Sequence, residues 1–408
     1  MKKIGIVTTW FERGAAYVSK QFKEVWEEEN EIFIYARGGE DVALNDPKWQ
    51  SENITYGQRY SYTNLDLINL YHFEQWIENN NLEIVFFNEQ HIWDPVLLCR
   101  KMGIITGSYI DYYTPQTVPL FDVFDFLICN TKRHYSVFKS HPQVFYVPWG
   151  TNQNIFNRSQ KKQTKLNEIV FFHSAGMNPY RKGTDFLIKA FSQLNSEKAK
   201  LIIHSQANIF SFFPKLKTVC KDLLNKKRIK IINKTISAPG LYHIGDVYVY
   251  PTRLEGIGLS IAESNSCGMP VITTNKAPMN EFIIDGNNGS LINVKSSKKR
   301  KDNYFWDESY IDVNHLTQIM KEYILNSEEL EDRKQKALIY SQNNFNWNKN
   351  SLALLTIVKE VKKLKKTKET FENVKRYEKA RGVKFYISNL VFVDKLKKKV
   401  KNILTKSY

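Results

Sequence analysis

The stretch Tyr250–Thr274, YPTRLEGIGLSIAESNSCGMPVITT, carries the strongest fold signal in the chain. Two glutamates, Glu255 and Glu263, flank seven residues that include a glycine-rich bend. Residues 246–252 predict a buried strand, a helix is expected from about Ser260, and PVITT predicts the next strand. This order of strand, loop, helix and strand is the repeating unit of a parallel sheet.

The same alternation of strand and helix patterns continues on both sides of this stretch. It predicts an α/β fold with two tandem doubly wound, Rossmann-like domains that face a cleft, followed by a basic helical C-terminal tail. We expect an N-terminal domain over residues 1–156, a polar linker over 157–166 and a second domain over 167–345. A helix over 346–365 can cross back to the N-terminal domain, and 366–408 form the basic amphipathic tail.

The composition suits a soluble globular protein, with 42% hydrophobic and 13% aromatic residues in 408. We find no run of about 18 apolar residues, so no membrane span is expected. The start, MKKIGIVTTWF, predicts a first strand rather than a signal peptide. Four scattered cysteines without a CxxC pair fit a reducing compartment. These features predict a cytoplasmic location, and the basic C-terminal tail predicts a peripheral position at the inner face of the cell membrane.

The net charge of +17 is concentrated at the C-terminus. Residues 361–408 hold 16 Lys and Arg against four Asp and Glu, which is +12 of the total. A basic amphipathic helix indicates binding to an anionic membrane surface, with Val393, Leu396 and Val400 on its apolar stripe. A helix packed on the N-terminal domain is the structural alternative. A basic nucleic-acid-binding protein is the alternative of another class, but the two-domain body is nearly balanced and carries no such motif, so no nucleic acid is expected.

The bend between the two glutamates lies where ligands bind in doubly wound sheets, at the carboxyl ends of the strands. The following helix start offers unpaired N–H groups to a diphosphate, and Gly256 and Gly258 allow the backbone to approach it. Glu255 and Glu263 could then accept hydrogen bonds from sugar and ribose hydroxyls. The structural alternative is a capping box, in which Glu263 binds the backbone N–H of Ser260.

Further motifs agree with one known family. RLEGIGLSIAESNSCGMPVITT resembles the E-x7-E region of retaining glycosyltransferases with the GT-B fold, especially family 4. HIGDVYVYPT, NEFIIDGNNGSLI, VPWGTNQNIF, YRKGTDFLIKAF and WFERGAAYVSKQF resemble other family segments in the same order. The resemblance covers about residues 1–350. It implies transfer of a sugar, with retention of configuration, from a nucleotide-sugar donor to a glycan, lipid-linked or other glycoconjugate acceptor, in surface polysaccharide synthesis.

The resemblance also implies roles for single residues. Glu255 would contact the donor sugar, Glu263 the ribose, and Lys182 the phosphates, while Gly14 would lie near the diphosphate. The donor-binding backbone comprises consecutive residues of the bend: Gly256, Ile257, Gly258, Leu259 and Ser260. The family often has an arginine about six residues before the lysine, where this chain has Gly176. Arg181 either supplies that second charge or is an ordinary surface residue.

The N-terminal domain contributes candidates for the acceptor side of the site. His91, Asp111 and Tyr112 follow predicted strands and could line the cleft, although an ordinary loop position is an equal alternative for His91. No Asp-x-Asp follows a strand, so we expect no metal ion and no cofactor beyond the nucleotide-sugar substrate. A nucleotide-sugar epimerase on a similar fold is the alternative enzyme, and it would convert the donor without an acceptor.

Overall fold

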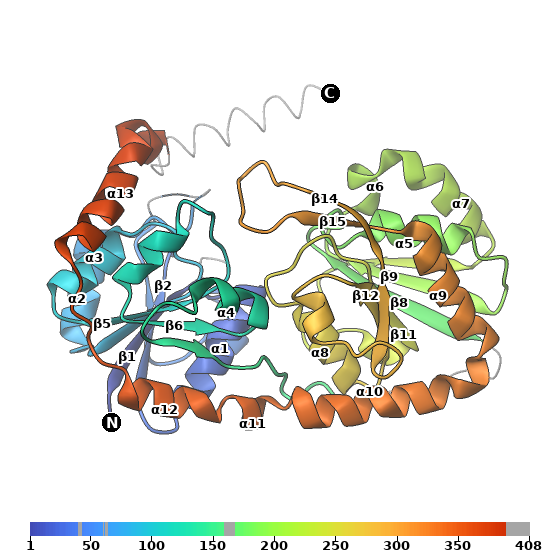
Figure 1. The fold of residues 1–408 in the computed structure, drawn as a ribbon, viewed down its shortest axis with the longest axis horizontal. Helices are drawn as coiled ribbons and strands as arrows, with labels where there is room; N and C mark the ends of the chain where they lie inside the picture. Colours follow the sequence, from blue (N-terminus) through green and yellow to red (C-terminus); the bar gives the residue numbers. More distant parts are fainter. Residues whose placement is uncertain (40–42, 60, 62–63, 159–167, 389–408) are drawn as a thin grey trace. The chain divides into compact units, whose positions relative to one another are not determined.

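Figure 1 shows the computed structural model, in which all residues are described except 40–42, 60, 62–63, 159–167 and 389–408. The chain divides into two compact units. Both units are discontinuous in sequence. Unit 1 consists of Met1–Asn130, His134–Val147 and Ser351–Tyr408. Unit 2 consists of Thr131–Arg133 and Pro148–Asn350.

The described part of unit 1 is built on a seven-stranded parallel sheet with the strand order β3-β2-β1-β4-β5-β6-β7. Its strands are β1 (Lys3–Thr8), β2 (Glu31–Ala36), β3 (Ile54–Tyr56), β4 (Ile84–Phe87), β5 (Ile105–Tyr109), β6 (Phe126–Cys129) and β7 (Val144–Tyr146). The connecting helices are α1 (Gly14–Trp26), η1 (Pro47–Trp49), α2 (Leu70–Asn79), α3 (Asp94–Lys101), η2 (Val118–Val123) and α4 (Lys132–Phe138).

The described part of unit 2 repeats this plan with a six-stranded parallel sheet, ordered β10-β9-β8-β11-β12-β13. Its strands are β8 (Ile169–Gly176), β9 (Ala199–Ser205), β10 (Ile229–Asn233), β11 (Val247–Tyr250), β12 (Val271–Thr274) and β13 (Gly289–Ile292). An antiparallel pair, β14 (Val294–Lys298) and β15 (Glu308–Ile311), follows β13.

The helices of unit 2 come mostly between its parallel strands and after β15. They are α5 (Thr184–Ser192), α6 (Ile209–Phe212), η3 (Pro214–Leu216), α7 (Lys217–Asn225), η4 (Tyr242–Ile244), α8 (Leu259–Ser266), η5 (Met279–Glu281), α9 (Val313–Leu325), η6 (Ser327–Glu329), α10 (Leu330–Asn344) and α11 (Trp347–Asn350). The predicted α/β class with two doubly wound domains is confirmed.

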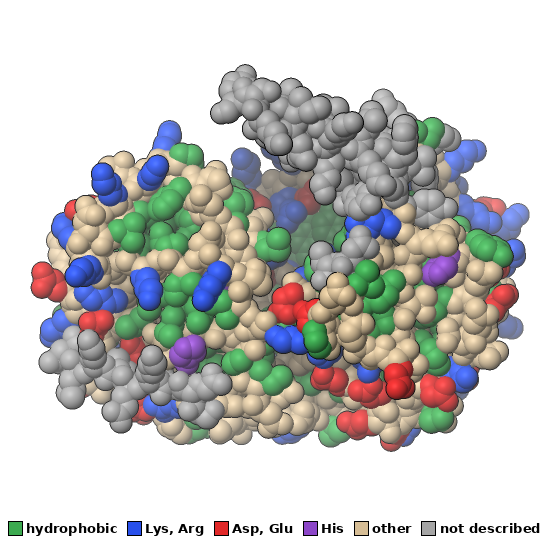
Figure 2. Space-filling model, turned by 180° about the vertical axis from the view of Figure 1, so that it is seen from behind, with side chains coloured by type: hydrophobic (Ala, Val, Ile, Leu, Met, Phe, Trp, Pro, Cys, Tyr) green, Lys and Arg blue, Asp and Glu red, His purple; other side chains and the backbone are tan. Residues whose placement is uncertain are grey.

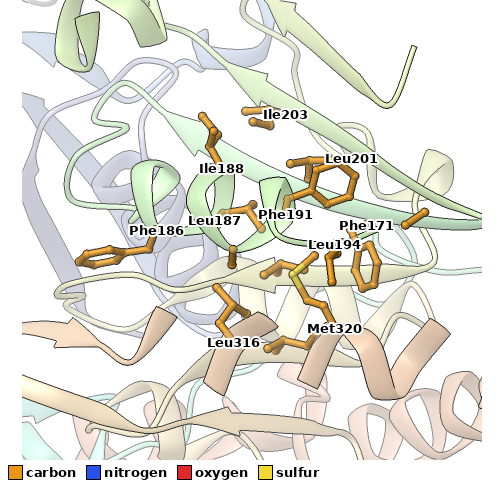
Figure 3. Close-up of a cluster of buried hydrophobic side chains, with 14 of the residues drawn as sticks. Phe171, Phe186, Leu187, Ile188, Phe191, Leu194, Leu201, Ile203, Leu316 and Met320 are labelled. Carbon is orange, nitrogen blue, oxygen red and sulfur yellow. The ribbon is translucent and has the colours of Figure 1, made fainter. Parts of the chain in front are cut away.

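Each sheet is covered by helices on both faces, which explains why several of its strands are buried along their whole length. In β4, β6, β11 and β12 every residue is buried. Figure 3 shows one such layer in unit 2, where the apolar face of α5 fills the space between the sheet and α9. The labelled members of this core are Phe171, Phe186, Leu187, Ile188, Phe191, Leu194, Leu201, Ile203, Leu316 and Met320.

The strand orders place a topological switch point in each unit. In unit 2 the chain goes from β8 outward to β10 and then returns to β11 on the other side of β8. Unit 1 has the same reversal between β1 and β4. Loops leave adjacent strands in opposite directions at such a point and open a crevice at the carboxyl edge of the sheet. The loops after β8 and β11, and those after β1 and β4, are therefore where ligand-binding residues are expected.

The C-terminal segment belongs to unit 1. In α12 (Leu352–Glu360) the carbonyl oxygen of Leu354 accepts a 3.1 Å hydrogen bond from the indole of Trp26. Further on, α13 (Lys368–Ser388) packs against η2. The first part of the segment expected to be a basic tail is thus a helix packed on unit 1, while the apolar stripe around Val393 lies outside the described residues. Among the described residues, no helix combines the length and apolar composition needed to cross a membrane.

A buried carboxylate fixes α13 to the loop that precedes α3. Glu378 is 5% exposed, and its Oε1 accepts a 3.0 Å hydrogen bond from the backbone N–H of Trp93. Trp93 is the N-cap residue of α3, whose first N–H groups have no partner within the helix. The side chain of Glu378 thus provides a hydrogen-bond acceptor at the start of α3, although Glu378 and Trp93 are 285 residues apart in the sequence.

Glu378→Ala should therefore destabilise the protein by about 1–3 kcal/mol, because it leaves the buried N–H of Trp93 without its acceptor. Urea unfolding followed by circular dichroism measures this. Glu372→Ala is the matched control on the same helix, because Glu372 is exposed and pairs only loosely with Lys368 at 3.6 Å. Equal midpoints for the two variants would contradict a structural role for Glu378.

Candidate functional site

The loop between β8 and α5 positions Lys182 at the switch point of unit 2. It closes as a tight turn, in which the N–H of Lys182 donates to the carbonyl of Asn178 at 3.1 Å. Gly183 has φ +70°, and a Cβ there would lie 1.9 Å from the carbonyl oxygen of Pro251. Only glycine allows this approach of the loop to the end of β11. The close contact brings Lys182 to the residues that follow β11.

Glu255 lies in the loop between β11 and α8, and three donors converge on one of its oxygens. Its Oε1 accepts hydrogen bonds from Lys182 Nζ at 2.8 Å, the Tyr250 hydroxyl at 2.7 Å and Thr252 Oγ1 at 2.6 Å. Arg181 Nη1 is 3.6 Å from the other oxygen, Oε2. The side chain of Glu255 is only 6% exposed, so the carboxylate is held in one orientation by its partners.

The two cations keep this buried carboxylate ionised. Burial by itself raises the pKa of Glu255, but the charges of Arg181 and Lys182 outweigh it and lower the pKa to about 2. The guanidinium of Arg181 thus lies beside this carboxylate, and its side chain is 39% exposed. At neutral pH Glu255 thus carries its negative charge between two cations, Arg181 and Lys182, which suit an anionic ligand.

Lys182 is the titratable cation of this group. Burial lowers the pKa of Lys182 to about 8, with Glu255 acting in the opposite direction and Arg181 adding to the decrease. Its Nζ also donates to the hydroxyl of Tyr250 and lies 4.8 Å from the centre of that ring. Lys182 is thus mostly protonated at pH 7 and loses its charge in mildly alkaline solution.

Glu263 does not form the capping box that its spacing from Ser260 allowed. The N-cap residue of α8 is Gly258, with φ +95° and no side-chain cap. The Oε2 of Glu263 instead accepts a 2.5 Å hydrogen bond from the hydroxyl of Tyr242. Burial raises the pKa of Glu263, an effect that the bond from Tyr242 and the charge of Lys182 reduce. The capping-box alternative does not hold, because the left-handed glycine starts the helix two residues earlier.

The glycine-rich bend has space beside Gly256. A Cβ on Gly256 would meet no atom within 4 Å. The first N–H groups of α8, at Leu259 and Ser260, have no acceptors within the helix and carry the positive end of its dipole. Ile257, by contrast, is 7% exposed and anchors the bend. The bend therefore combines this space and the N-terminus of α8 with the adjacent Lys182 and Glu255 side chains.

Sequence reasoning missed three of the hydroxyl groups that organise this site. Tyr250 and Thr252 lie at the carboxyl end of β11. Because ligand sites form at the carboxyl ends of parallel strands, both could have been predicted as hydrogen-bond donors to Glu255. Tyr242 lies in η4, in a segment that no pattern marked. The residues of unit 2 that were predicted and are brought together are Lys182, Arg181 and Glu255, with Glu263 on the adjacent helix.

Unit 1 has its own charged cluster at the switch point between β1 and β4. Arg13 precedes α1, which begins at Gly14, and its Nη2 lies 2.9 Å from Oε2 of Glu89 after β4. Glu89 has φ +54°, a conformation that is strained for a residue with a side chain. The guanidinium of Arg37, 1% exposed, lies 2.6 Å from Asp66 and contacts the backbone carbonyl of Glu89.

His91 lies between two aspartates in this cluster. Its Nδ1 is 2.8 Å from Asp66 Oδ2, its Nε2 is 3.8 Å from Asp111 Oδ2, and the Tyr112 ring meets it edge-on at 5.2 Å. Burial favours the neutral imidazole, but the carboxylates of Asp111 and Asp66 outweigh it and raise the pKa of His91 to about 10. His91, Asp111 and Tyr112 are thus neighbours, and the imidazole is cationic at neutral pH.

The described residues show no metal centre, and the face in Figure 2 shows no single basic patch. Within them, no three His, Cys, Asp or Glu side chains come together as a metal site requires. On the face that Figure 2 shows, Lys and Arg side chains stand apart from one another, with Asp and Glu side chains among them. The charge that this surface shows is therefore dispersed.

The bend, the two glutamates and the lysine all lie in or beside one segment with known relatives. Residues 154–303 match the family model described as glycosyl transferases group 1. This segment is a group 1 glycosyltransferase domain. A probable sucrose-phosphate synthase of Thermosipho melanesiensis is 25% identical over 182 residues, which cover 41% of this chain and 42% of the relative. The chain thus matches less than half the length of its curated relatives.

Solved structures extend the likeness to the whole fold. The structure of HepE from Anabaena, in complex with UDP and glucose, has a TM-score of 0.67 at 15% identity, covering 88% of this chain and all of that one. WaaG, a glycosyltransferase involved in lipopolysaccharide biosynthesis, has a TM-score of 0.63 at 13% identity, covering 87% of this chain and 99% of that one. The chain has the GT-B fold that these structures share.

Proposed function

We propose that the chain is a retaining glycosyltransferase of family 4. It moves a sugar from a nucleotide-sugar donor to a glycan, lipid-linked or other glycoconjugate acceptor in surface polysaccharide synthesis. The observation that carries this proposal is the buried carboxylate of Glu255, held ionised between Lys182 and Arg181 at the switch point of the group 1 domain. Such a carboxylate suits sugar hydroxyls, and the two cations suit a diphosphate.

The residues of unit 2 would divide the work between binding and charge stabilisation. In the proposed step the acceptor oxygen bonds to the anomeric carbon on the face that the diphosphate leaves. The bond from that carbon to the diphosphate breaks with its electron pair on the diphosphate, whose oxygen takes the acceptor proton. Lys182, Arg181 and the N-terminus of α8 stabilise the charge that develops there. Glu255 fixes the donor sugar and Glu263 the ribose.

We place the acceptor side of the reaction in unit 1. His91 would serve as a hydrogen-bond donor rather than a base, because the two aspartates keep it protonated. Asp111 would accept from acceptor hydroxyls, Tyr112 would stack on a sugar ring, and the chain at Gly14 would approach the diphosphate. The N-terminal ends of α1 and α8 both follow switch-point strands, which supports this assignment.

The cellular setting is also part of the proposal. We place the protein in the cytoplasm, peripheral at the inner face of the membrane, with the lysines of residues 389–408 on an anionic surface. Lipid-linked acceptors would be available there. The reaction uses neither a metal ion nor a nucleic-acid partner.

A nucleotide-release assay over UDP-, GDP- and ADP-sugars, with product mass analysis, tests the function. We expect one donor to release nucleotide only when an acceptor extract is present, and EDTA to leave the rate unchanged. Conversion of the sugar without any acceptor would instead identify an epimerase. Release of no nucleotide from any donor, by protein that still binds UDP in calorimetry, would contradict the transferase proposal.

Glu263→Gln should weaken UDP binding by about tenfold or more, since a charged acceptor for the ribose is replaced by a neutral one. Isothermal calorimetry measures this. Tyr242→Phe is the matched variant, because it removes the hydroxyl that Glu263 now binds and leaves the carboxylate for the ribose. We expect a smaller loss for it. Unchanged UDP affinity in Glu263→Gln, with only a lower melting temperature, would mean that Glu263 is structural.

A further inference from the structure

A half-open groove in unit 1 lies outside the candidate site. Its volume is about 340 Å³, and it lies where α13 runs beside α3 (Figure 1). Residues of these two helices line it: Leu97, Leu98, Arg100 and Lys101 from α3, and Phe371 and Lys375 from α13. The volume is at the lower end of the range for small-molecule sites, which is about 300–1,000 Å³. It suits a single narrow ligand.

The lining of the groove has two chemically distinct parts. Leu97, Leu98 and Phe371 are half-buried and supply the apolar part. The charge of Arg100 is neutralised within the protein, because its guanidinium pairs with Asp125. The same guanidinium donates to the carbonyl of Leu364 at 2.8 Å. Lys101 and Lys375 are exposed, and neither forms an ion pair with any described residue. The groove is thus apolar inside with two unneutralised cations at its rim.

This combination fits a ligand that is apolar along its length and anionic at one end. The alternative occupant from the same chain is the segment 389–408, which directly follows α13. That segment contains six lysines and one aspartate, so its charge has the same sign as the rim. Like charges repel at contact distance, and the segment is therefore a poor partner for Lys101 and Lys375. An anionic phospholipid has the complementary charge and an acyl chain of the required shape.

We propose that the groove between α3 and α13 binds one anionic phospholipid, with an acyl chain against Leu97, Leu98 and Phe371 and the phosphate between Lys101 and Lys375. The site shares no residue with the switch point of either unit. It gives unit 1 a lipid contact that is distinct from the basic residues after Ser388. The chemistry recognised is a phosphate next to an alkyl chain, not charge alone.

The first test is sedimentation of the full chain with vesicles of phosphatidylglycerol and phosphatidylcholine. Each lysine near an anionic surface contributes about fivefold to partitioning, so Lys101→Glu/Lys375→Glu should lose about 25-fold or more. Lys217→Glu/Lys321→Glu is the charge-matched control, because both lysines are exposed on helices of unit 2 and form no ion pair with a described residue. Equal losses in the two double variants would overturn the proposal.

The second test separates a lipid in the groove from general surface attraction. Monomeric lysophosphatidylglycerol, below its micelle concentration, should bind the full chain with one-to-one stoichiometry in calorimetry. Leu98→Asp should weaken this binding at least tenfold, and inorganic phosphate should not compete at millimolar concentration. If Leu98→Asp proves unfolded, the Lys101→Glu/Lys375→Glu variant gives the same comparison. Displacement of the lipid by a peptide of residues 389–408 would identify that segment as the occupant and overturn the proposal.

Discussion

Glu255→Gln should lower kcat/KM for donor turnover by about 100-fold or more, the scale of losing one preorganised electrostatic contact. The change removes the negative charge and keeps the shape of the side chain. The amide oxygen can still accept from Tyr250 and Thr252, so the loop should keep its conformation. The charge of Glu255 also raises the pKa of Lys182, and its removal leaves the lysine less protonated at neutral pH. Initial rates with the donor identified in the panel assay measure the effect.

Asp246→Asn is the matched control for this prediction. Asp246 immediately precedes β11, the strand that Glu255 follows, and its Oδ1 is paired with Lys334 Nζ at 2.6 Å. Both changes replace a buried, lysine-paired carboxylate by an amide in the same unit, but at opposite ends of one strand. Asp246→Asn should lower the melting temperature and keep most of the activity. A Glu255→Gln enzyme with near-normal transfer would exclude a role for Glu255 at the donor sugar.

The alkaline limb of the pH profile should belong to Lys182. Its protonated form stabilises the leaving diphosphate, and its pKa in the protein without donor is about 8. We therefore expect kcat/KM to be constant below that pH and to fall about tenfold per pH unit above it. Bound diphosphate favours the charged form and raises the pKa, so donor binding at high pH should be accompanied by proton uptake. Rates and calorimetry between pH 6 and 10 measure both.

Two variants isolate the lysine. Lys182→Ala should lose about 100-fold or more in kcat/KM at pH 7 because it removes the charge altogether. Lys182→Arg keeps a charge that does not titrate in this range, so its lower rate should show no break near pH 8. An alkaline limb that persists unchanged in Lys182→Arg would assign the titration to another group and contradict this role.

The positions of the elements followed from local patterns. Continuous apolar segments such as IVFF and VYVY can be buried only in a sheet covered on both faces, and their spacing along the chain leaves room for connecting helices. The order of motifs therefore predicted two doubly wound domains and placed Glu255, Lys182 and the glycine bend at strand ends. These features depend on residues close together in the sequence, which is why the sequence by itself was sufficient.

Contacts between distant residues could not be predicted in this way. Lys182 and Glu255 are 73 residues apart, and the sequence did not indicate that Tyr250 and Thr252 would share the same carboxylate oxygen. The capping box was a valid local pattern, but the left-handed Gly258 and the hydroxyl of Tyr242 replaced it. The hydroxyl of Tyr242 comes within reach of Glu263 only after the chain has folded. The spacing of residues along the sequence therefore could not choose between capping and ligand binding.

The C-terminal segment shows the same limit. An amphipathic pattern indicates that one face of a helix is apolar. A helix that lies on a membrane and a helix that packs on a protein have the same pattern. The basic composition indicated a membrane for everything after Lys366. In the structure Glu378 accepts a hydrogen bond from Trp93, the N-cap residue of α3, and Arg381 contacts the backbone of His91, so α13 packs on unit 1. The sequence determined that this segment is basic, and only the tertiary structure decided that residues 368–388 lie on unit 1, because packing depends on which complementary surface lies nearby.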